Sequence, residues 1–295
     1  MILKNGWEFI NDRTKSGRGR YSLNRGDGQT IPLTGCTTIL NEQAKPFLIG
    51  WAASEAYKDC LANGYSKEQL EEIIKLKKYA HTKKGDDAKA TGTDAHDLVE
   101  NFIRHYIKTK EYLPLFGDNK EANVSAKRFF DWAQERKVEF VSCEVSVFDD
   151  RMMVGGSFDF ICKIDGEFYL GDFKTSKQID NTYYAQTAFY INATNRMKEL
   201  NQEEKINFKG AVIVKSVKQE GDIEYMEKYG AGWRKVVIPA FEVKFAQDID
   251  RHMIYFKSLY NAYKYNKDQK VEFSEEYVSK YPELSDEELL KLETE

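Results

Sequence analysis

The feature that most constrains this fold is Asp165-Gly166, which separates two β-rich runs at residues 157–164 and 167–174. Asp-Gly between β-forming segments is a strong signal for a hairpin closed by a two-residue type I′ turn. Counting outward from such a turn places Asp159 directly opposite Asp172. The Cβ atoms of such a pair are about 4.5–5.5 Å apart. The sequence therefore predicts two carboxylates on one face of a hairpin.

Lys174 comes two residues after Asp172, so it projects from the same face of the strand. Opposed carboxylates repel each other unless positive charge offsets them. Lys174 supplies part of that charge, and a divalent cation supplies more, because carboxylate oxygens suit hard ions such as Mg²⁺ or Mn²⁺. The alternative is a surface hairpin whose charges are opposed by chance. Strongly apolar neighbours favour a central hairpin instead: Phe158, Phe160, Ile161, Tyr169 and Leu170.

Composition limits the protein classes that fit the 295-residue chain. Aromatic residues make up 14% of it, which argues against disorder, and the net charge of -4 argues against a histone-like coating protein. The longest apolar run, residues 46–53, is far shorter than the roughly 20 residues of a membrane span. The first residues contain no apolar signal segment. We therefore expect a cytosolic protein in which any nucleic-acid site is a local basic surface.

The four cysteines are widely spaced and form no C-x-x-C pair, so we expect reduced thiols and neither a zinc ribbon nor an iron–sulfur cluster. They are Cys36, Cys60, Cys143 and Cys162.

Hydrophobic periodicity and turn residues predict one α/β domain over residues 1–295. Its first part, 1–135, is largely helical with N-terminal strands, 138–266 forms the sheet core with covering helices, and 267–295 is a tail. We expect the mostly antiparallel sheet to come from the second half. Helices are predicted at about 46–62, 66–83, 93–108, 124–137, 181–199 and 246–266, and strands at 138–149, 157–164, 167–174, 210–217 and 235–244.

Four motifs in order resemble the PD-(D/E)XK nuclease superfamily, and specifically its RecB-like exonuclease branch. Gly156-x-x-Asp159 with Asp172-Phe173-Lys174 resembles the catalytic hairpin of that branch. A histidine motif (Gly92-Thr-Asp-Ala-His96, opening a helix) and a Q-x-x-x-Y motif (Gln186 to Tyr190) also match. The segment from Thr34 to Trp51 is similar to the N-terminal region of phage exonucleases and of the mitochondrial genome maintenance exonuclease.

Two departures from the superfamily pattern are visible. Phe158 stands where the superfamily name has proline, which many members also lack, and the four-cysteine iron–sulfur set of some relatives is absent.

The resemblance implies a restriction-endonuclease-like core, with a central, mostly antiparallel mixed sheet flanked by helices. It implies that His96, Asp159, Asp172 and the Phe173 backbone carbonyl bind one or two Mg²⁺ or Mn²⁺ ions. Lys174 would act with the two aspartates in catalysis, orienting a water or stabilising negative charge. Glu144 is either a further metal ligand or a residue that contacts the ligands without binding the metal itself. Glu100 shares a helix face with His96 and either holds the imidazole or is an ordinary solvated residue.

DNA contacts are predicted at several positions. Gln186 and Tyr190 share one helix face and either contact DNA near the scissile phosphate or form a half-buried helix side. Tyr183 or Tyr184 is available for base stacking. Two basic segments either track phosphates or are solvated: Arg13, Lys15, Arg18, Arg20 and Arg25, and then Lys75, Lys77, Lys78, Lys83, Lys84 and Lys89.

The resemblance thus implies a metal-dependent DNA exonuclease acting from single-stranded ends, in the cytoplasm of a bacterial or phage-infected cell. The alternatives are a structure-specific or flap endonuclease of the same fold, a non-catalytic DNA-binding or partner-binding protein, and a metal hydrolase with another substrate. No membrane partner is expected.

Overall fold

The computed structural model describes residues 1–295 except 14–18, 27, 46, 76–78, 231 and 281–295. Its centre is an eight-stranded mixed sheet in the order β1-β2-β3-β5-β6-β7-β10, with β4 pairing β5 outside that path. Antiparallel pairs predominate, and β3–β5 and β6–β7 are parallel. These strands are β1 Glu8–Arg13, β2 Gly19–Asn24, β3 Thr30–Gly35, β4 Glu139–Asp149, β5 Val154–Ile164, β6 Glu167–Lys174, β7 Phe208–Ser216 and β10 Phe241–Ala246.

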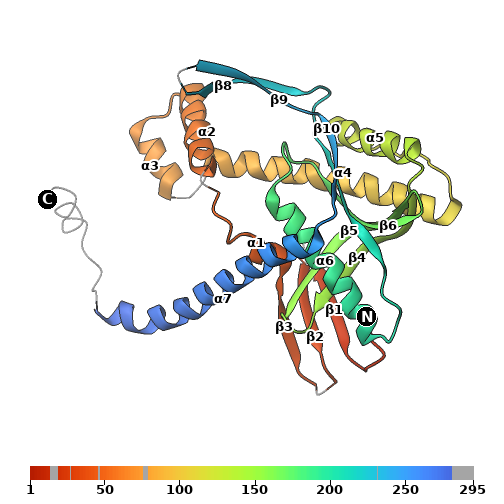
Figure 1. Ribbon diagram of the computed structural model, residues 1–295. Coiled ribbons are helices and arrows are strands. Elements are labelled where there is room, and N and C mark those ends of the chain that lie inside the picture. The colour runs from red at the N-terminus through yellow and green to blue at the C-terminus, as the bar shows by residue number, and fades with distance from the viewer. Residues whose placement is uncertain (14–18, 27, 46, 76–78, 231, 281–295) are drawn as a thin grey trace.

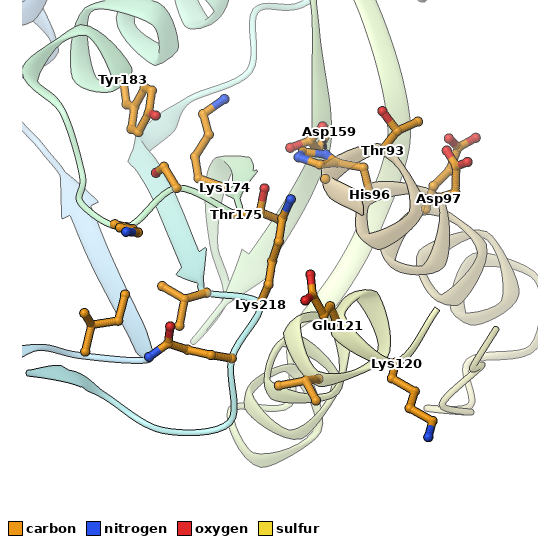
Figure 2. Close-up of a pocket in the computed structure, with 18 of the residues that line it drawn as sticks. Thr93, His96, Asp97, Lys120, Glu121, Asp159, Lys174, Thr175, Tyr183 and Lys218 are labelled. Atoms are coloured by element: carbon orange, nitrogen blue, oxygen red, sulfur yellow. Dashed lines mark ion pairs between the residues drawn. The ribbon is translucent and has the colours of Figure 1, made fainter. Parts of the chain in front are cut away.

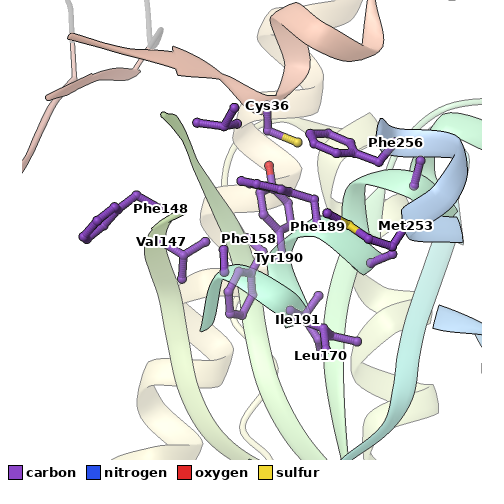
Figure 3. Packing of buried hydrophobic residues seen from close by; sticks show 14 of the residues in the cluster. Cys36, Val147, Phe148, Phe158, Leu170, Phe189, Tyr190, Ile191, Met253 and Phe256 are labelled. Atoms are coloured by element: carbon purple, nitrogen blue, oxygen red, sulfur yellow. The ribbon is translucent and has the colours of Figure 1, made fainter. Parts of the chain in front are cut away.

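Helices cover both faces of this sheet (Figure 1). On one face, α4 and α5 bury an aromatic cluster that includes Phe102, Phe129 and Phe160. On the other, α1, α6 and α7 bury a second cluster around Phe158, Phe189 and Phe256, in which Tyr190 also lies (Figure 3). The helices are α1 Cys36–Leu40, α2 Phe47–Asn63, α3 Lys67–Lys75, α4 Ala80–Thr109, α5 Lys120–Glu135, α6 Asn181–Leu200 and α7 Ile249–Lys280.

A separate two-stranded hairpin, β8 Ile223–Tyr229 with β9 Gly232–Ile238, stands apart from the main sheet. None of the helices in the described part of the chain combines the length and apolar character needed to cross a membrane.

The predicted mixed α/β class is confirmed. The helix α3 is capped at its N-terminus by Ser66. Ser66 Oγ accepts a hydrogen bond from the Gln69 N–H (3.3 Å), and the Ser66 N–H donates to Gln69 Oε1 (2.8 Å). This reciprocal pair is a capping box, which satisfies N–H groups that have no partner within the helix.

Several boundaries were wrong. α4 begins at Ala80 rather than near residue 93, so Gly92 and His96 lie inside a long helix and not at its start. The strand expected over 235–244 is two strands, β9 and β10, on either side of Pro239, which lacks the N–H that a ladder needs. β8 was not predicted. The helix expected over 66–83 ends at Lys75, and α7 extends through part of the expected tail, to Lys280.

The sheet is also not a product of the second half alone, because β1, β2 and β3 join it through the parallel pairing of β3 with β5. The rest of the expected tail, residues 281–295, lies outside the described residues.

Candidate active site

The β5–β6 hairpin has the predicted turn and register. Asp165 and Gly166 both adopt positive φ, 53° and 84°, and Ile164 pairs with Glu167. The ladder continues outward to the pair Phe160–Gly171, which is one position short of Asp159 and Asp172. The two aspartates therefore stand where the ladder ends.

The two strands separate at this point because β5 changes partner. β4 pairs with one edge of β5 from residue 154 to 163, so β6 and β3 must share the other edge. β6 occupies that edge at residues 160–164, and β3 occupies it at 154–155. Asp159 lies in the interval between these two partners, at a fork in the sheet.

Asp159 is held by two elements at the fork. Its Oδ2 accepts a hydrogen bond from the Phe173 backbone N–H at 2.6 Å, and its Oδ1 lies 3.4 Å from His96 Nδ1. The Phe173 ring packs edge-on against the His96 imidazole, with 5.1 Å between ring centres. The Asp159 side chain is 18% exposed and that of His96 34%, so this pair can be reached from solvent.

Asp172 is more deeply buried, with a side chain only 4% exposed, and its partner is Lys174. Lys174 Nζ lies 2.9 Å from Asp172 Oδ1, to which it donates a hydrogen bond, and 2.7 Å from Oδ2. Oδ2 itself accepts no well-oriented hydrogen bond although it is buried. The Lys174 ammonium also lies 5.0 Å from the centre of the Tyr183 ring, within range of a cation–π contact.

Charge interactions shift the pKa values of these groups in different directions. Burial lowers the pKa of His96, but Asp159 more than offsets this, so the pKa lies above its ordinary value. Burial raises the pKa of Asp159, but His96, Lys174 and the Phe173 N–H lower it below its ordinary value. Near neutral pH, Asp159 is therefore a carboxylate.

The Lys174–Asp172 pair is governed by its burial. Burial lowers the pKa of Lys174, but Asp172 and Asp159 more than offset this, so Lys174 is an ammonium. Burial also raises the pKa of Asp172; Lys174 lowers it in part and Asp159 raises it again, which leaves it above its ordinary value. Of the two aspartates, Asp172 thus takes up a proton more readily.

The expectation of two carboxylates that converge on one cation is not met in this conformation. Among the described residues, no three His, Cys, Asp or Glu side chains form a ready group for a metal ion. Asp159 contacts His96 and accepts a hydrogen bond from the Phe173 N–H, whereas Asp172 forms an ion pair with Lys174. Each carboxylate is therefore paired with a different side chain of the protein.

The donor types nevertheless suit a divalent ion. A partly exposed carboxylate and an imidazole lie side by side, and the buried Asp172 Oδ2 lacks a well-oriented hydrogen bond. Oxygen donors with one imidazole fit Mg²⁺ or Mn²⁺. The residues present can therefore hold such an ion if the side chains reorient.

The other predicted ligands lie close by. Glu144, on β4, lines the same pocket as Asp159 and has a positive φ of 51°, which is unusual for a residue within a strand. Phe173 pairs with Val214 in the β6–β7 ladder. Glu100 also lines the pocket, but it pairs with Arg104 at 2.6 Å rather than with His96, so its predicted role in holding the imidazole is corrected.

A pocket of about 1230 Å³ opens over this corner (Figure 2). His96 and Asp159 form one part of its wall, and Lys174 and Tyr183 form another. Several residues that line it were not predicted, because Ser157 and Thr175 carry no distinctive motif and the others come from distant segments. They are Tyr21, Ser157, Thr175, Glu121 and Lys218.

The two residues of the Q-x-x-x-Y motif are buried. Tyr190 is 2% and Gln186 7% exposed, and Gln186 Nε2 donates a hydrogen bond to the Tyr190 hydroxyl at 3.0 Å. The Tyr190 ring packs against Phe158, and a Cβ on Gly156 would meet it at 2.5 Å. Their predicted contact with DNA is therefore corrected: in this conformation both side chains pack in the core.

The remaining predicted DNA contacts divide into two groups. Tyr183 lines the pocket and is half-buried, and its stacking role stays a prediction. Arg18 lies outside the described residues, as do the side chains of Arg20, Lys83 and Lys84.

Comparison with known proteins adds no family: no model of a protein family matches the chain, and no curated protein matches it.

Proposed function

We propose that the chain is a metal-dependent DNA exonuclease of the RecB-like PD-(D/E)XK type, which hydrolyses phosphodiester bonds from single-stranded ends. The observation that supports this most is the fork at the end of the β5–β6 ladder. It holds Asp159 beside His96 and a buried Asp172 beside Lys174, at the wall of a pocket. A protein that only binds DNA has no need to bury two carboxylates this close to each other, since their repulsion is unfavourable.

The finer fold assignment belongs to the same proposal. A β-hairpin followed by a parallel strand (β5, β6 and β7), with helices on both faces, agrees with a restriction-endonuclease-like core.

Each of the chain's own groups has a role in this proposal. Asp159 and His96 would hold the divalent ion, and His96 must lose its proton to do so. Asp172 would contribute its Oδ2 as a further ligand. When bound, Mg²⁺ or Mn²⁺ would lower the pKa of a water and neutralise charge on the scissile phosphate. Glu144 and the Phe173 carbonyl are the further candidate ligands.

Lys174 is the residue proposed to act on the reacting atoms. Its ammonium is fixed between Asp172 and the Tyr183 ring and lines the pocket. There it orients the attacking water or stabilises the negative charge that develops on the phosphate. Tyr183, on the same wall, offers a ring on which a terminal base can stack.

The test is digestion of end-labelled linear and circular DNA, single- and double-stranded, with Mg²⁺, Mn²⁺ or EDTA. We expect metal-dependent release of nucleotides from linear single strands, no cleavage of circles, and loss of activity in Lys174→Ala. Lys163→Ala, a change in the same hairpin at a lysine that packs over Phe168, is the matched control. Cleavage of circles would favour the endonuclease alternative, and activity that survives Lys174→Ala would refute the mechanism.

A further inference from the structure

Besides Lys174, the pocket is lined by a half-buried lysine, Lys218, on the loop that follows β7. Figure 2 shows its side chain extending toward Thr175 and toward the part of α4 that carries His96. None of the roles assigned above uses Lys218. Its position relative to the candidate active site gives it a role of its own.

The Lys218 ammonium is located by its distance from Gly92. A Cβ built on Gly92 would lie 3.9 Å from Lys218 Nζ and 3.1 Å from Thr175 Oγ1. Gly92 precedes His96 by four residues in α4, so the two share a helix face about 6 Å apart along the axis. Lys218 Nζ therefore lies beside the turn of α4 that precedes His96. The rise of one helical turn, about 5.4 Å, is similar to the spacing of neighbouring phosphates along a nucleic-acid strand.

The loop that carries Lys218 is firmly anchored to α5. The Arg128 guanidinium donates hydrogen bonds to the carbonyls of Val217 (2.8 Å), Gln219 (2.6 Å) and Glu220 (2.6 Å). Ser125 Oγ donates to the Ser216 carbonyl at 2.7 Å. Four consecutive or near-consecutive carbonyls are thus fixed by one helix, which leaves the backbone of Lys218 little freedom.

The other side of the loop is held by the neighbouring strands. The Val217 N–H donates to the Ala240 carbonyl at 2.9 Å, and the Ala240 N–H donates to Asp222 Oδ1 at 2.7 Å. A lysine on a loop held from both sides is pre-positioned, and pre-positioning reduces the entropy lost when a ligand binds.

The partial burial of Lys218 favours an anionic ligand. Burial lowers its pKa, and the carboxylates of Glu121 and Asp94 raise it in part, which leaves the pKa below its ordinary value. Partial burial of an ammonium strengthens its attraction to an anion, because less water screens the charge. A lysine ammonium is a compact point charge, which suits the non-bridging oxygens of a phosphate.

We propose that Lys218 binds the phosphate next to the scissile one, so that the pocket contacts two successive phosphates of the DNA strand. Lys174 and the metal ligands act on the first phosphate and Lys218 binds its neighbour. Gly92 leaves room beside Lys218, because a Cβ there would crowd Thr175 Oγ1 at 3.1 Å and lie in contact with Lys218 Nζ at 3.9 Å. This inference rests on the proposed function and names a substrate subsite for it.

The first test is binding of a labelled single-stranded oligothymidylate in EDTA at several salt concentrations, which needs no catalysis. We expect Lys218→Met to weaken binding about tenfold. The slope of log affinity against log salt should fall by about 0.7, as for one lost phosphate contact with a single strand. Lys209→Met, at an exposed lysine on β7, should bind like the wild type. Equal affinity and slope in Lys218→Met would overturn the inference.

The second test changes the DNA, and circular dichroism first checks that Lys218→Met is folded. Single methylphosphonates, which remove one phosphate charge, are placed in turn along the oligonucleotide. One position next to the cleavage site should weaken binding to the wild type and have no further effect on Lys218→Met. If every position weakens both proteins equally, Lys218 does not bind a phosphate.

The outcomes separate the two proposals. If the wild type cleaves DNA but neither test shows a Lys218-dependent phosphate, only the subsite is wrong. If the wild type neither binds nor cleaves DNA, the proposed function fails and the subsite with it.

Discussion

The polar residues on the two faces of the central sheet differ in their exposure to solvent. On the α6 side, Tyr190 and Gln186 satisfy each other within a packed apolar cluster. On the α4 side, His96 and Asp159 pair at the wall of a pocket and remain partly exposed. Both pairs were singled out by sequence motifs. A sequence motif thus identifies residues that lie close together in the fold, but it does not reveal whether they contact a ligand or only each other.

Strand β5 separates these two environments. Gly156 and Phe158 face Tyr190, whereas Ser157 and Asp159 line the pocket, as alternation along a strand requires. One strand therefore supplies both a dry packing surface and a polar site.

The largest expected effect is a loss of stability on the α6 face of the sheet, where the Tyr190 ring is packed. Tyr190→Ala removes a fully buried ring and should lower the free energy of unfolding by about 3–5 kcal/mol. Tyr190→Phe removes only the hydroxyl that accepts from Gln186 and should cost about 1 kcal/mol. Denaturant unfolding measures both. DNA affinity unchanged in Tyr190→Phe supports the packing role, whereas a large loss of affinity with unchanged stability would contradict it.

On the pocket side, Lys174→Gln should lower the rate of metal-dependent cleavage by about 10²–10³-fold, because it removes a charge aimed at the phosphate. The comparison variant is Lys163→Gln, at a lysine of the same hairpin outside the pocket. Single-turnover digestion gives the rates, and circular dichroism checks that each variant is folded. Equal rates for the two variants would remove Lys174 from the mechanism.

A smaller effect is expected where the two sides meet, at Gly156. A Cβ there would lie 2.5 Å from the Tyr190 ring, which is closer than van der Waals contact allows. Gly156→Ala should therefore destabilise the protein by about 1–3 kcal/mol. Gly221→Ala is the control, because a Cβ at Gly221 meets nothing within 4 Å. Thermal unfolding that is the same in both variants would show that α6 does not pack on β5 as described.

The smallest effect concerns pH in the absence of metal. The pKa of His96 is raised, so its ion pair stabilises the fold below about pH 6.5 and this contribution is lost as pH rises through the folded-state value. The pKa of Asp159 is lowered, so its contribution is present above about pH 3.9 and is lost as pH falls further.

Melting temperatures in EDTA across this range should therefore be highest between the two limits. The stability advantage of wild type over His96→Gln should be small, about 1 kcal/mol, because the ion pair is partly exposed to solvent. It should disappear at alkaline pH. If the stability of wild type relative to His96→Gln instead increased with pH, His96 and Asp159 would not form a stabilising ion pair.

The sequence specified the hairpin well because Asp165-Gly166 fixes turn and register locally. It did not specify what happens beyond Phe160 and Gly171, since the divergence of β5 from β6 depends on β3, a strand more than a hundred residues earlier. The start of α4 was missed because residues 80–92 contain two glycines and little apolar periodicity. Lys218 was missed because its position depends on Arg128, from a different segment.

The most direct measurement of the central claim is Mn²⁺ binding, followed by electron paramagnetic resonance, to wild type, Asp159→Asn and the control Asp131→Asn, a surface change on α5. We predict saturable binding to wild type and Asp131→Asn, and binding at least about tenfold weaker in Asp159→Asn. Wild-type protein that binds no Mn²⁺, or Asp159→Asn protein that binds it equally well, would show that the fork in the sheet is no metal site.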